Sequence, residues 1–560
     1  MAQFPPAASE LPLARLYHWE RTRTHFPHLT QPMGNGVVRD YTWGHVLGEV
    51  RRIAAYLKAQ NWPAGSSIAI LGKNSAHWLM ADYAIWMAGH VSVPIYPTLT
   101  ADSVRQILIH SEAKACFIGK LDGFTAMQPG IPDSVHCIAV PLAPKTHYAQ
   151  WDDIVARTPP LEGEVTRRGD ELATIIYTSG TTGMPKGVMH SFNAMTWTAK
   201  SLEERYGVFP EDRMLSYLPL SHVAERWVVE MGVLNGGFRV FFAESLETFA
   251  QDLQRARPTN FISVPRLWVK FMQGVQAKIP QKKLDLLLSI PLLNRVIKKK
   301  ILQGLGLDQA RFAGGGASPM PASMLQWFNR LGLELLEGYG MTENFGCSHS
   351  NKPGHGRPGY VGVTYPGVEH RISAIGELEM RSPALMMGYF KEPEKTRATM
   401  TDDGWLKTGD KGEIDSEGRL KITGRVKDLF KTSKGKYVAP APIEDKLVAH
   451  PKVEACCVAG ADFAQPFGIV MLSAEAASHL KEADQKQALQ ASLTEHLAAI
   501  NATLDQHEQL DFLAAVTEQW TVEAGFITPT MKIKRDVIER TYGPHFSAWA
   551  QRKSEVVFHP

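Results

Sequence analysis

The chain has 560 residues, of which 44% are hydrophobic and 21% are charged, which is typical of folded globular proteins and excludes a disordered, collagen-like or coiled-coil chain. Its 60 Lys and Arg residues against 57 Asp and Glu residues leave a formal charge of +3, without the basic excess expected of a protein whose main partner is nucleic acid. At roughly 100–200 residues per domain, this length allows about three to five domains or one large enzyme of several lobes.

The first third of the chain alternates between helical and strand patterns. Between Thr42 and Gln60, apolar residues recur at spacings that place them on one face of a helix. Short apolar runs follow at 67–71, 91–95, 115–119 and 135–140, separated by polar helical stretches. This alternation predicts βαβ units on a largely parallel sheet, and therefore an α/β fold.

The most informative segment of the chain lies between Thr174 and Val188. An apolar run leads into a row of small hydroxyl residues and glycines, followed by a lysine. Small residues let backbone N–H groups approach an oligophosphate, while hydroxyl groups and a lysine add donors and positive charge. The spacing is not that of a Walker A loop, and a surface turn without a ligand is the alternative. We expect an anion site made by Thr178, Ser179, Gly180, Thr181, Thr182, Gly183 and Lys186.

The second half is richer in glycine, with glycine-containing turns at 314–316, 338–340 and 353–362. Near Gly424 a charged stretch begins, and the residues beyond it have their own apolar periodicity. We expect a large N-terminal domain of αβ-layered subdomains at 1–424, a hinge at 425–430 and a small, mobile C-terminal α+β domain at 431–560.

The five cysteines show neither a Cys-x-x-Cys pair nor a zinc-type spacing with histidine. They predict reduced, mostly buried thiols of a cytosolic protein. The N-terminal residues lack the pattern of a secretory signal, and the chain has no run of about 18 uncharged apolar residues that could span a membrane. We therefore expect a cytoplasmic location.

Residues 177–187, with the sequence Tyr-Thr-Ser-Gly-Thr-Thr-Gly-Met-Pro-Lys-Gly, resemble the signature loop of the adenylate-forming superfamily. This superfamily includes acyl-CoA synthetases, the adenylation domains of peptide synthetases and firefly-type luciferases. Further motifs of the family follow in order at 217–222, 314–317, 339–343, 376–378, 405–410, 424–428 and 528–535. The resemblance implies ATP, Mg²⁺ and coenzyme A as ligands. It also implies that a carboxylate attacks the α-phosphate of ATP, and that a thiol then displaces AMP from the acyl-adenylate.

The resemblance places the nucleotide around the glycine-rich motifs of the second half. Glu343 matches the magnesium ligand of the family, with Thr178 as a second expected ligand, and one carboxylate with phosphates and waters is the usual way to hold Mg²⁺. Thr342 would contact the adenylate phosphate, and Tyr339 would stack on adenine. A turn at 314–317 would line the adenine and acyl pockets, where a side chain would collide with ligand. The other residues expected at the nucleotide are Gly314, Gly315, Gly316, Ala317, Glu337, Gly338, Gly340 and Met341.

For each of these residues a structural role is the alternative: a helix-capping Glu343, a core Tyr339, and a tight turn at 314–317 without a ligand. Asp410 resembles the carboxylate that accepts both ribose hydroxyl groups, and Arg425 its partner on the other side of the ribose. Lys427 occupies the hinge position about which the small domain of the family rotates after adenylation.

Lys532 matches the catalytic lysine that reaches the α-phosphate during adenylation, where an ammonium group stabilises developing negative charge. Thr530 and Met531 replace the Ser-Gly that often precedes this lysine, as in the long-chain fatty acyl branch. Lys534 is a competing candidate two residues later. His222 aligns with a residue at the mouth of the acyl pocket that acts in adenylation and as a gate, and a core histidine is its alternative.

The segments 218–226, 264–268 and 431–444 resemble the fatty acyl-CoA synthetase branch, so a medium- or long-chain fatty acid is the expected substrate. Residues 282–301 place several leucines beside Arg295, Lys298, Lys299 and Lys300, and Pro291 interrupts the pattern. Such a basic amphipathic stretch can lie on an anionic bilayer, or it can pack on the core. We expect weak, salt-sensitive contact with the inner face of a membrane, and a homodimer is a further open partner.

Three functions remain open on the sequence. The first is an AMP-forming fatty acyl-CoA synthetase. The second is an adenylating ligase for an aryl or other carboxylate, or one that loads a carrier protein. The third is a sensor that binds a nucleotide without catalysis. Because Glu343, Asp410, Arg425 and Lys532 are all present, the third is the weakest of the three.

Overall fold

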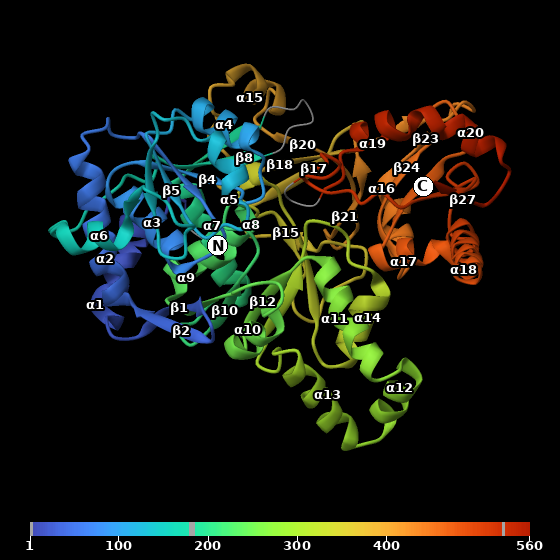
Figure 1. Ribbon diagram of the computed structural model, residues 1–560, viewed down its shortest axis with the longest axis horizontal. Coiled ribbons are helices and arrows are strands. Elements are labelled where there is room, and N and C mark those ends of the chain that lie inside the picture. Colours follow the sequence, from blue (N-terminus) through green and yellow to red (C-terminus); the bar gives the residue numbers. More distant parts are fainter. Residues whose placement is uncertain (1–3, 179–184, 529–531, 560) are drawn as a thin grey trace. The chain divides into compact units, whose positions relative to one another are not determined.

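The computed structural model describes residues 4–178, 185–528 and 532–559. The chain forms two compact units, the first made of residues 1–370 and 380–406 and the second of residues 371–379 and 407–560 (Figure 1). The hinge expected at 425–430 falls within the second unit, and its role as a hinge stays a prediction.

The first unit contains a large mixed sheet of strand order β19-β9-β8-β4-β3-β5-β6-β7. Neighbouring strands from β8 to β7 pair in parallel, whereas β9 runs antiparallel to both β8 and β19. The apolar runs of the sequence form its central strands, which confirms the predicted parallel sheet. The strands are β3 (Ser67–Leu71), β4 (Val91–Ile95), β5 (Ala115–Ile118), β6 (His136–Ala139), β7 (Ala149–Gln150), β8 (Leu172–Thr178), β9 (Lys186–Ser191) and β19 (Gly388–Tyr389).

Two smaller sheets complete the first unit, with strand orders β10-β11-β1-β2 and β12-β13-β14-β15-β16. In the second of these, β12, β13 and β14 are parallel, and β15 and β16 continue antiparallel. The strands are β1 (Pro27–Gly34), β2 (Val37–Thr42), β10 (Arg213–Ser216), β11 (Arg239–Phe242), β12 (Asn260–Ser263), β13 (Phe312–Gly315), β14 (Leu335–Tyr339), β15 (His349–Ser350) and β16 (Val363–Thr364).

Helices cover both faces of the large sheet. Alternate residues of β3 point to opposite faces, so that Ile68 and Ile70 join one apolar core and Ala69 and Leu71 join another. The helix predicted between Thr42 and Gln60 is α2 (Trp43–Ala59), which Thr42 caps by accepting a hydrogen bond from the backbone N–H of His45.

The other helices of the first unit are α1 (Pro12–Arg23), α3 (Ala76–Met87), α4 (Ala101–His110), α5 (Phe124–Met127), α6 (Trp151–Arg157), α7 (Phe192–Tyr206), α8 (Val223–Glu225), α9 (Gly232–Gly236), α10 (Phe249–Ala256), α11 (Pro265–Lys278), α12 (Gln281–Ser289), α13 (Leu293–Gly304), α14 (Ala322–Arg330) and α15 (Pro393–Thr399). A π-helical segment, η3 (Arg226–Met231), joins α8 to α9.

The second unit is α+β, as expected. A sheet of order β17-β18-β20-β21 and the ribbon β22-β23 precede the sheet β24-β25-β26-β27, which α16 and α18 cover on one face and α19 and α20 on the other. Its elements are β17 (Glu369–Ile372), β18 (Glu377–Arg381), β20 (Leu406–Ile414), β21 (Leu420–Arg425), β22 (Phe430–Lys431), β23 (Tyr437–Val438), α16 (Pro440–Leu447), β24 (Val453–Ala459), β25 (Phe467–Leu472), α17 (Ala474–Ser478), α18 (Ala483–Asn501), β26 (Leu513–Val516), α19 (Arg535–Tyr542), α20 (Phe546–Gln551) and β27 (Val556–His559).

All five cysteines are buried and none forms a disulfide, which confirms the prediction of buried free thiols. Among the helices of the described residues, none has both the length and the apolar character that crossing a membrane requires.

Candidate functional site

The expected phosphate loop connects the antiparallel strands β8 and β9. Thr178 at the end of β8 pairs in register with Lys186 at the start of β9, so the strands fix both ends of the loop. The Lys186 Nζ lies 5.4 Å from the centroid of the Tyr389 ring, within the range of a cation–π interaction. The expected contacts of Ser179, Gly180, Thr181, Thr182 and Gly183 lie outside the described residues.

Glu343 lies in a short 3₁₀ turn, η4 (Thr342–Asn344), which follows the end of β14. The Tyr389 hydroxyl group donates a hydrogen bond to Glu343 Oε1 at 2.8 Å, and the backbone N–H of Met386 donates to the Glu343 carbonyl at 2.8 Å. Burial, and then the nearby Glu343 carboxylate, raise the pKa of Tyr389, which keeps the hydroxyl group protonated as a donor. Tyr389 therefore connects the expected metal ligand Glu343 with the loop lysine Lys186.

Tyr389 was not among the residues predicted from the sequence. It lies 46 residues after Glu343, in the two-residue strand β19, and reaches Glu343 only because β19 pairs with β9 at the edge of the large sheet. The sequence offered only a Gly-Tyr dipeptide here, which carries no chemical signal of its own.

The carbonyl group of Thr342 is held by His190 of β9, whose Nε2 lies 2.7 Å from the Thr342 oxygen. Burial lowers the pKa of His190 to about 4, so the ring is neutral at physiological pH, and its Nε2 must carry the proton that the carbonyl accepts. Thr342 itself is buried. Residues 342–343 are thus fixed against β9 and β19, next to the expected phosphate loop.

The glycines at 314–316 do not form the turn that the sequence suggested. Gly314 and Gly315 belong to strand β13, with Gly316 and Ala317 directly after it. A Cβ atom on Gly314 would lie 2.3 Å from the Leu336 carbonyl oxygen, and one on Gly316 would lie 2.5 Å from the Gly338 oxygen. Close packing against β14 is therefore a sufficient reason for these glycines. Ala317 has φ = 69°, an uncommon conformation for a residue with a side chain.

Strand β14 carries the motif with Glu337 and Tyr339. The Glu337 carboxyl group accepts a hydrogen bond from the backbone N–H of Met320 at 3.3 Å, and burial raises the pKa of Glu337 to about 7. Tyr339 pairs in register with His349 of β15, next to the pair of Gly338 and Ser350. Strands β13 and β14 are neighbours, so Ala317 follows the end of one strand and Tyr339 ends the other, with Gly340 and Met341 directly after β14.

His222 caps the short helix α8. Its Nδ1 accepts a hydrogen bond from the backbone N–H of Ala224 at 3.2 Å, so this ring nitrogen is the unprotonated one of the neutral imidazole. The ring is half-buried. His222 therefore caps α8, and its expected function at the acyl pocket stays a prediction.

Glu225, at the end of α8, is buried beneath the same segment. Its Oε1 accepts hydrogen bonds from Ser216 Oγ at 2.8 Å and from the backbone N–H of Tyr217 at 3.0 Å. Burial raises the pKa of Glu225 from 4.5 to about 8, because the apolar surroundings disfavour the charged form.

This carboxyl group predicts a loss of stability as the pH rises from about 4.5 to about 8. Above pH 4.5 the unfolded chain has released the proton, while the folded protein keeps it until about pH 8. The free energy of unfolding should therefore fall by about 1.4 kcal/mol for each pH unit within that window from this group alone. Urea denaturation across the window should show this decline in the wild type and a smaller one in Glu225→Gln; equal slopes for the two proteins would contradict it.

The second unit brings the two expected ribose residues together. Asp410 and Arg425 lie opposite each other in the antiparallel pair β20–β21, with Arg425 Nε 3.0 Å from Asp410 Oδ1. The Asp410 side chain is 8% exposed, whereas that of Arg425 is 51% exposed. Their register on one sheet shows why residues 15 positions apart in the sequence meet.

Lys532, in the second unit, forms two hydrogen bonds with Thr528. Its backbone N–H donates to Thr528 Oγ1 at 3.1 Å, and its carbonyl accepts from the backbone N–H of Thr528 at 2.7 Å. The Lys532 side chain is exposed, while Lys534, the N-cap residue of α19, is half-buried. Lys427 lies in the turn between β21 and β22.

The oxygen ligands that the first unit offers suit a magnesium ion. The described residues contain no group of three or more His, Cys, Asp or Glu side chains that could form a metal cage by themselves. A single fixed carboxylate, Glu343, instead suits a cation that keeps most of its waters and takes further oxygens from the phosphates of the substrate. Thr178, the second expected ligand, lies at the end of β8 with its side chain half-buried.

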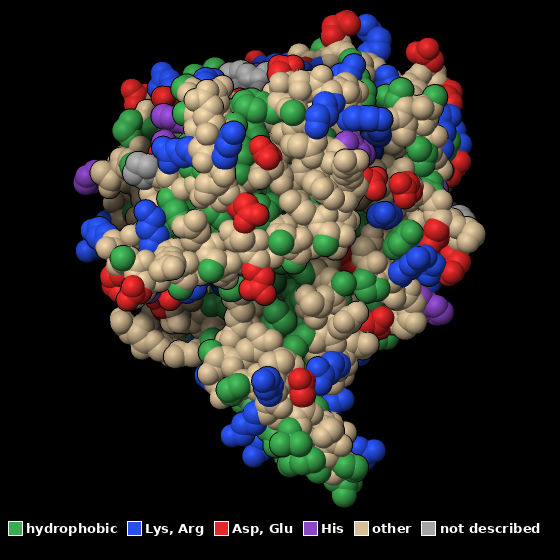
Figure 2. Space-filling model, turned by 90° about the vertical axis from the view of Figure 1, so that its right-hand side faces the viewer, with side chains coloured by type: hydrophobic (Ala, Val, Ile, Leu, Met, Phe, Trp, Pro, Cys, Tyr) green, Lys and Arg blue, Asp and Glu red, His purple; other side chains and the backbone are tan. Residues whose placement is uncertain are grey.

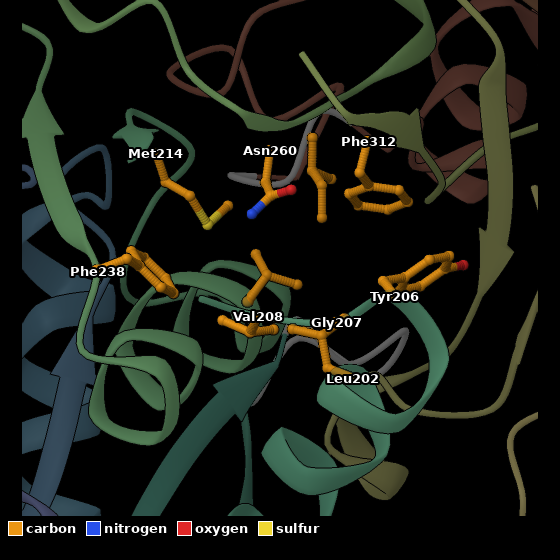
Figure 3. A pocket seen from close by; sticks show the side chains of 10 residues that line it. Leu202, Tyr206, Gly207, Val208, Met214, Phe238, Asn260 and Phe312 are labelled. Atoms are coloured by element: carbon orange, nitrogen blue, oxygen red, sulfur yellow. The ribbon is translucent and has the colours of Figure 1, made fainter. Parts of the chain in front are cut away.

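One enclosed cavity of the first unit is lined by residues of α7, β10, β12 and β13 (Figure 3). Its volume of about 20 Å³ matches a single water molecule. Met214, Phe238 and Phe312 point into it and make it largely apolar. This cavity is too small for an acyl chain and belongs to the packing of the core.

Comparison with known proteins gives two family matches. Residues 18–390 match the AMP-binding enzyme family, and residues 427–545 match the AMP-binding enzyme C-terminal domain. The long-chain fatty-acid–CoA ligase FadD15 of Mycobacterium bovis is 29% identical over 92% of this chain and 93% of its own length. Long chain acyl-CoA synthetase 7 of Arabidopsis thaliana, a peroxisomal protein, is 29% identical over 90% of this chain and 81% of its own length.

Solved structures show the same fold. The adenylation domain of a carboxylate reductase from Mycobacterium chelonae is 23% identical and superposes with a TM-score of 0.80, covering 97% of this chain and 91% of that domain. The anthranilate CoA ligase AuaEII is 21% identical, with a TM-score of 0.77 and coverage of 97% of this chain and all of its own. These similarities confirm the predicted α/β class with a separate C-terminal domain.

Proposed function

This chain belongs to the family of AMP-binding enzymes, and we propose that it is an AMP-forming acyl-CoA ligase that activates a medium- or long-chain fatty acid. The observation that carries the proposal is the placement of Lys186, Tyr389, Glu343 and Thr342 around the ends of β8 and β14. Relatives named as long-chain fatty-acid–CoA ligases, which align over nine-tenths of the chain, support the fatty acid as substrate.

In the adenylation step, the chain's main task is to align two anions and to offset the negative charge that develops at the α-phosphate. The loop between Thr178 and Lys186 would bind the phosphates of ATP through backbone N–H groups and the Lys186 ammonium group. Glu343, oriented by Tyr389, would hold Mg²⁺, with Thr178 as its second ligand. A bound magnesium ion supplies neutralisation of the phosphate charge.

Each unit offers residues for a different part of the nucleoside. Tyr339 would stack on adenine, with the backbone at 314–317 beside it, and the Asp410 carboxylate would accept hydrogen bonds from the ribose hydroxyl groups next to Arg425. Lys532 would donate to the α-phosphate while the carboxylate of the fatty acid attacks and pyrophosphate leaves. Rotation about Lys427 would then withdraw Lys532, and the thiol of CoA would attack the acyl carbon and release AMP.

The first half-reaction can be tested by itself. With ATP, Mg²⁺ and a fatty acid but no CoA, the protein should exchange labelled pyrophosphate into ATP, because adenylation is reversible while the acyl-adenylate stays bound. Release of ADP and phosphate instead of exchange would contradict the proposal, since it would mean attack at the γ-phosphate.

The hydrogen bond from Tyr389 to Glu343 predicts a specific effect of Tyr389→Phe. Without the donor, the carboxylate loses one of its fixed partners, so the Mg²⁺ concentration at half-maximal exchange should rise by about tenfold, the effect of one hydrogen bond to a charged group. Tyr437→Phe, which removes a hydroxyl group from a side chain that is 63% exposed, is the matched control. If Tyr389→Phe needed the same Mg²⁺ concentration as the wild type, Glu343 would not be a magnesium ligand.

A further inference from the structure

Helices α12 and α13 form a hairpin that extends from the first unit below α11 and α14 (Figure 1). Pro291 lies at the break between the two helices, where the sequence predicted an interruption. The inward faces of the hairpin hold it to the body, because Leu284 and Ile301 are buried in the core of α11, α14 and β12–β14. The outward faces and the tip of the hairpin do not hold it to the body in this way.

The tip of this hairpin is apolar and exposed. Leu292 is 76% exposed, Leu286 64%, Val296 50% and Ile290 41%. Figure 2 shows hydrophobic side chains gathered at the end of the lowest part of the molecule. Large hydrophobic residues that cluster in this way on a projecting element mark an interaction surface.

The backbone at the tip presents Leu292 outward at a conformational cost. Leu292 has φ = 66° and ψ = −46°, and the backbone N–H of Leu293 donates to the Pro291 carbonyl at 2.8 Å, which is a γ-turn of the rare, strained kind. Glycine or asparagine would take a positive φ more easily. Leu292 has a strained backbone and a side chain that is 76% exposed, so this side chain adds little to the core. It can therefore contact a partner.

Basic residues surround this tip. Residues 281–304 contain six Lys and Arg residues and one acidic residue, a net charge of +5, whereas the whole chain has +3. The one acidic residue, Asp285, is paired with Arg330 of α14 at 2.7 Å. The exposed basic residues are Lys282, Lys283, Arg295, Lys299 and Lys300, and Figure 2 shows basic side chains flanking the hydrophobic end.

We propose that the tip of the α12–α13 hairpin inserts into the surface of a lipid bilayer that contains anionic lipids. An apolar tip ringed by cations matches the two layers of such a surface, the acyl chains inside and the anionic headgroups outside. A second copy of this chain fits less well, because two hairpins that each carry +5 would repel. The inference goes beyond the proposed function, although a ligase for fatty acids would meet its substrate in such a bilayer.

Co-sedimentation of the full-length protein with lipid vesicles tests this inference. Vesicles of equal parts phosphatidylcholine and phosphatidylglycerol should bind the protein at low ionic strength, and both high salt and pure phosphatidylcholine should release it. A tip variant, Ile290→Ser with Leu292→Asn, and a ring variant, Arg295→Gln with Lys299→Gln and Lys300→Gln, should each bind at least about tenfold more weakly. Asparagine at 292 tolerates the positive φ, which keeps the hairpin intact.

The matched control removes three charges elsewhere in the first unit, from the exposed residues Lys114, Lys145 and Arg157, by substitution with glutamine. This control should bind the vesicles as the wild type does. Equal losses in the ring variant and the control would overturn the inference, because net charge alone would then explain binding. A tip variant that binds vesicles normally would also overturn it, as would one that changes only the oligomeric state, which would assign the tip to a second copy. Because vesicle binding needs no substrate, its failure is separable from failure of the proposed ligase activity.

Discussion

Replacement of Lys532 by alanine is expected to slow adenylation by about 100- to 1000-fold, the effect of removing one donor aimed at developing charge. The Lys532 side chain is exposed, and its backbone is held by two hydrogen bonds to Thr528, one to the Oγ1 atom and one from the backbone N–H. ATP binding should persist in the variant, because the phosphate loop and the ribose pair are untouched.

The second half-reaction, thioester formation, can be measured separately from adenylation. Supplied with a synthetic acyl-adenylate and CoA, Lys532→Ala should form acyl-CoA at close to the wild-type rate, since the lysine acts before AMP leaves. The control is Lys534→Ala, which removes the same charge two residues later. Full adenylation in Lys532→Ala, together with its loss in Lys534→Ala, would move the catalytic assignment to Lys534.

Replacement of Arg226 by methionine is expected to destabilise the first unit by about 3–5 kcal/mol, as for other buried ion pairs that lose one partner. The guanidinium group of Arg226 pairs with Asp82, lies 2.7 Å from Glu230 Oε2 and donates to Thr174 Oγ1 at 2.5 Å. The Arg226, Asp82 and Glu230 side chains are all inaccessible to solvent. Without Arg226, two carboxyl groups would remain buried and uncompensated.

Denaturation by urea measures this effect. Arg397→Met serves as the control, because its ion pair with Glu394 is exposed and should contribute less than about 1 kcal/mol. The triple substitution Arg226→Met, Asp82→Asn and Glu230→Gln should recover part of the loss, since it removes the stranded charges. If Arg226→Met unfolded at the same urea concentration as the wild type, the buried cluster would have no structural importance.

The buried cluster of Arg226, Asp82, Glu230 and Thr174 also connects two segments of the candidate functional site. Thr174 belongs to β8, the strand that leads into the expected phosphate loop, and Arg226 begins the π-helix that follows His222. The cluster therefore links the segment with His222 to the strand with Thr178. Helical segments with the wider π geometry often occur at functional sites.

The sequence predicted well those features that depend on neighbours along the chain. The apolar runs at 67–71 and 91–95 became strands β3 and β4, and the amphipathic pattern after Thr42 became α2. These elements follow from periodicity and local capping, which short segments carry by themselves. The family motifs likewise indicated the fold, because a motif is local.

Features that depend on residues far apart in the sequence were missed. Tyr389 reaches Glu343 only through the pairing of β19 with β9, and Asp82 and Thr174 meet Arg226 from separate elements. The glycines at 314–316 were interpreted as a turn because the sequence does not show the carbonyl groups of the neighbouring strands, which leave no room for a side chain. In each of these cases, contacts between separate elements of the fold determine the structure, and the local sequence does not show them.

The most direct test of the fatty acyl-CoA ligase assignment is one incubation series with ATP, Mg²⁺, CoA and a panel of carboxylates, in which AMP and the CoA thioester are measured together. Medium- or long-chain fatty acids should give AMP and acyl-CoA in equal amounts, and aromatic acids should give little of either. AMP formed only with aromatic acids, or acyl transfer only to a carrier protein and not to CoA, would contradict it.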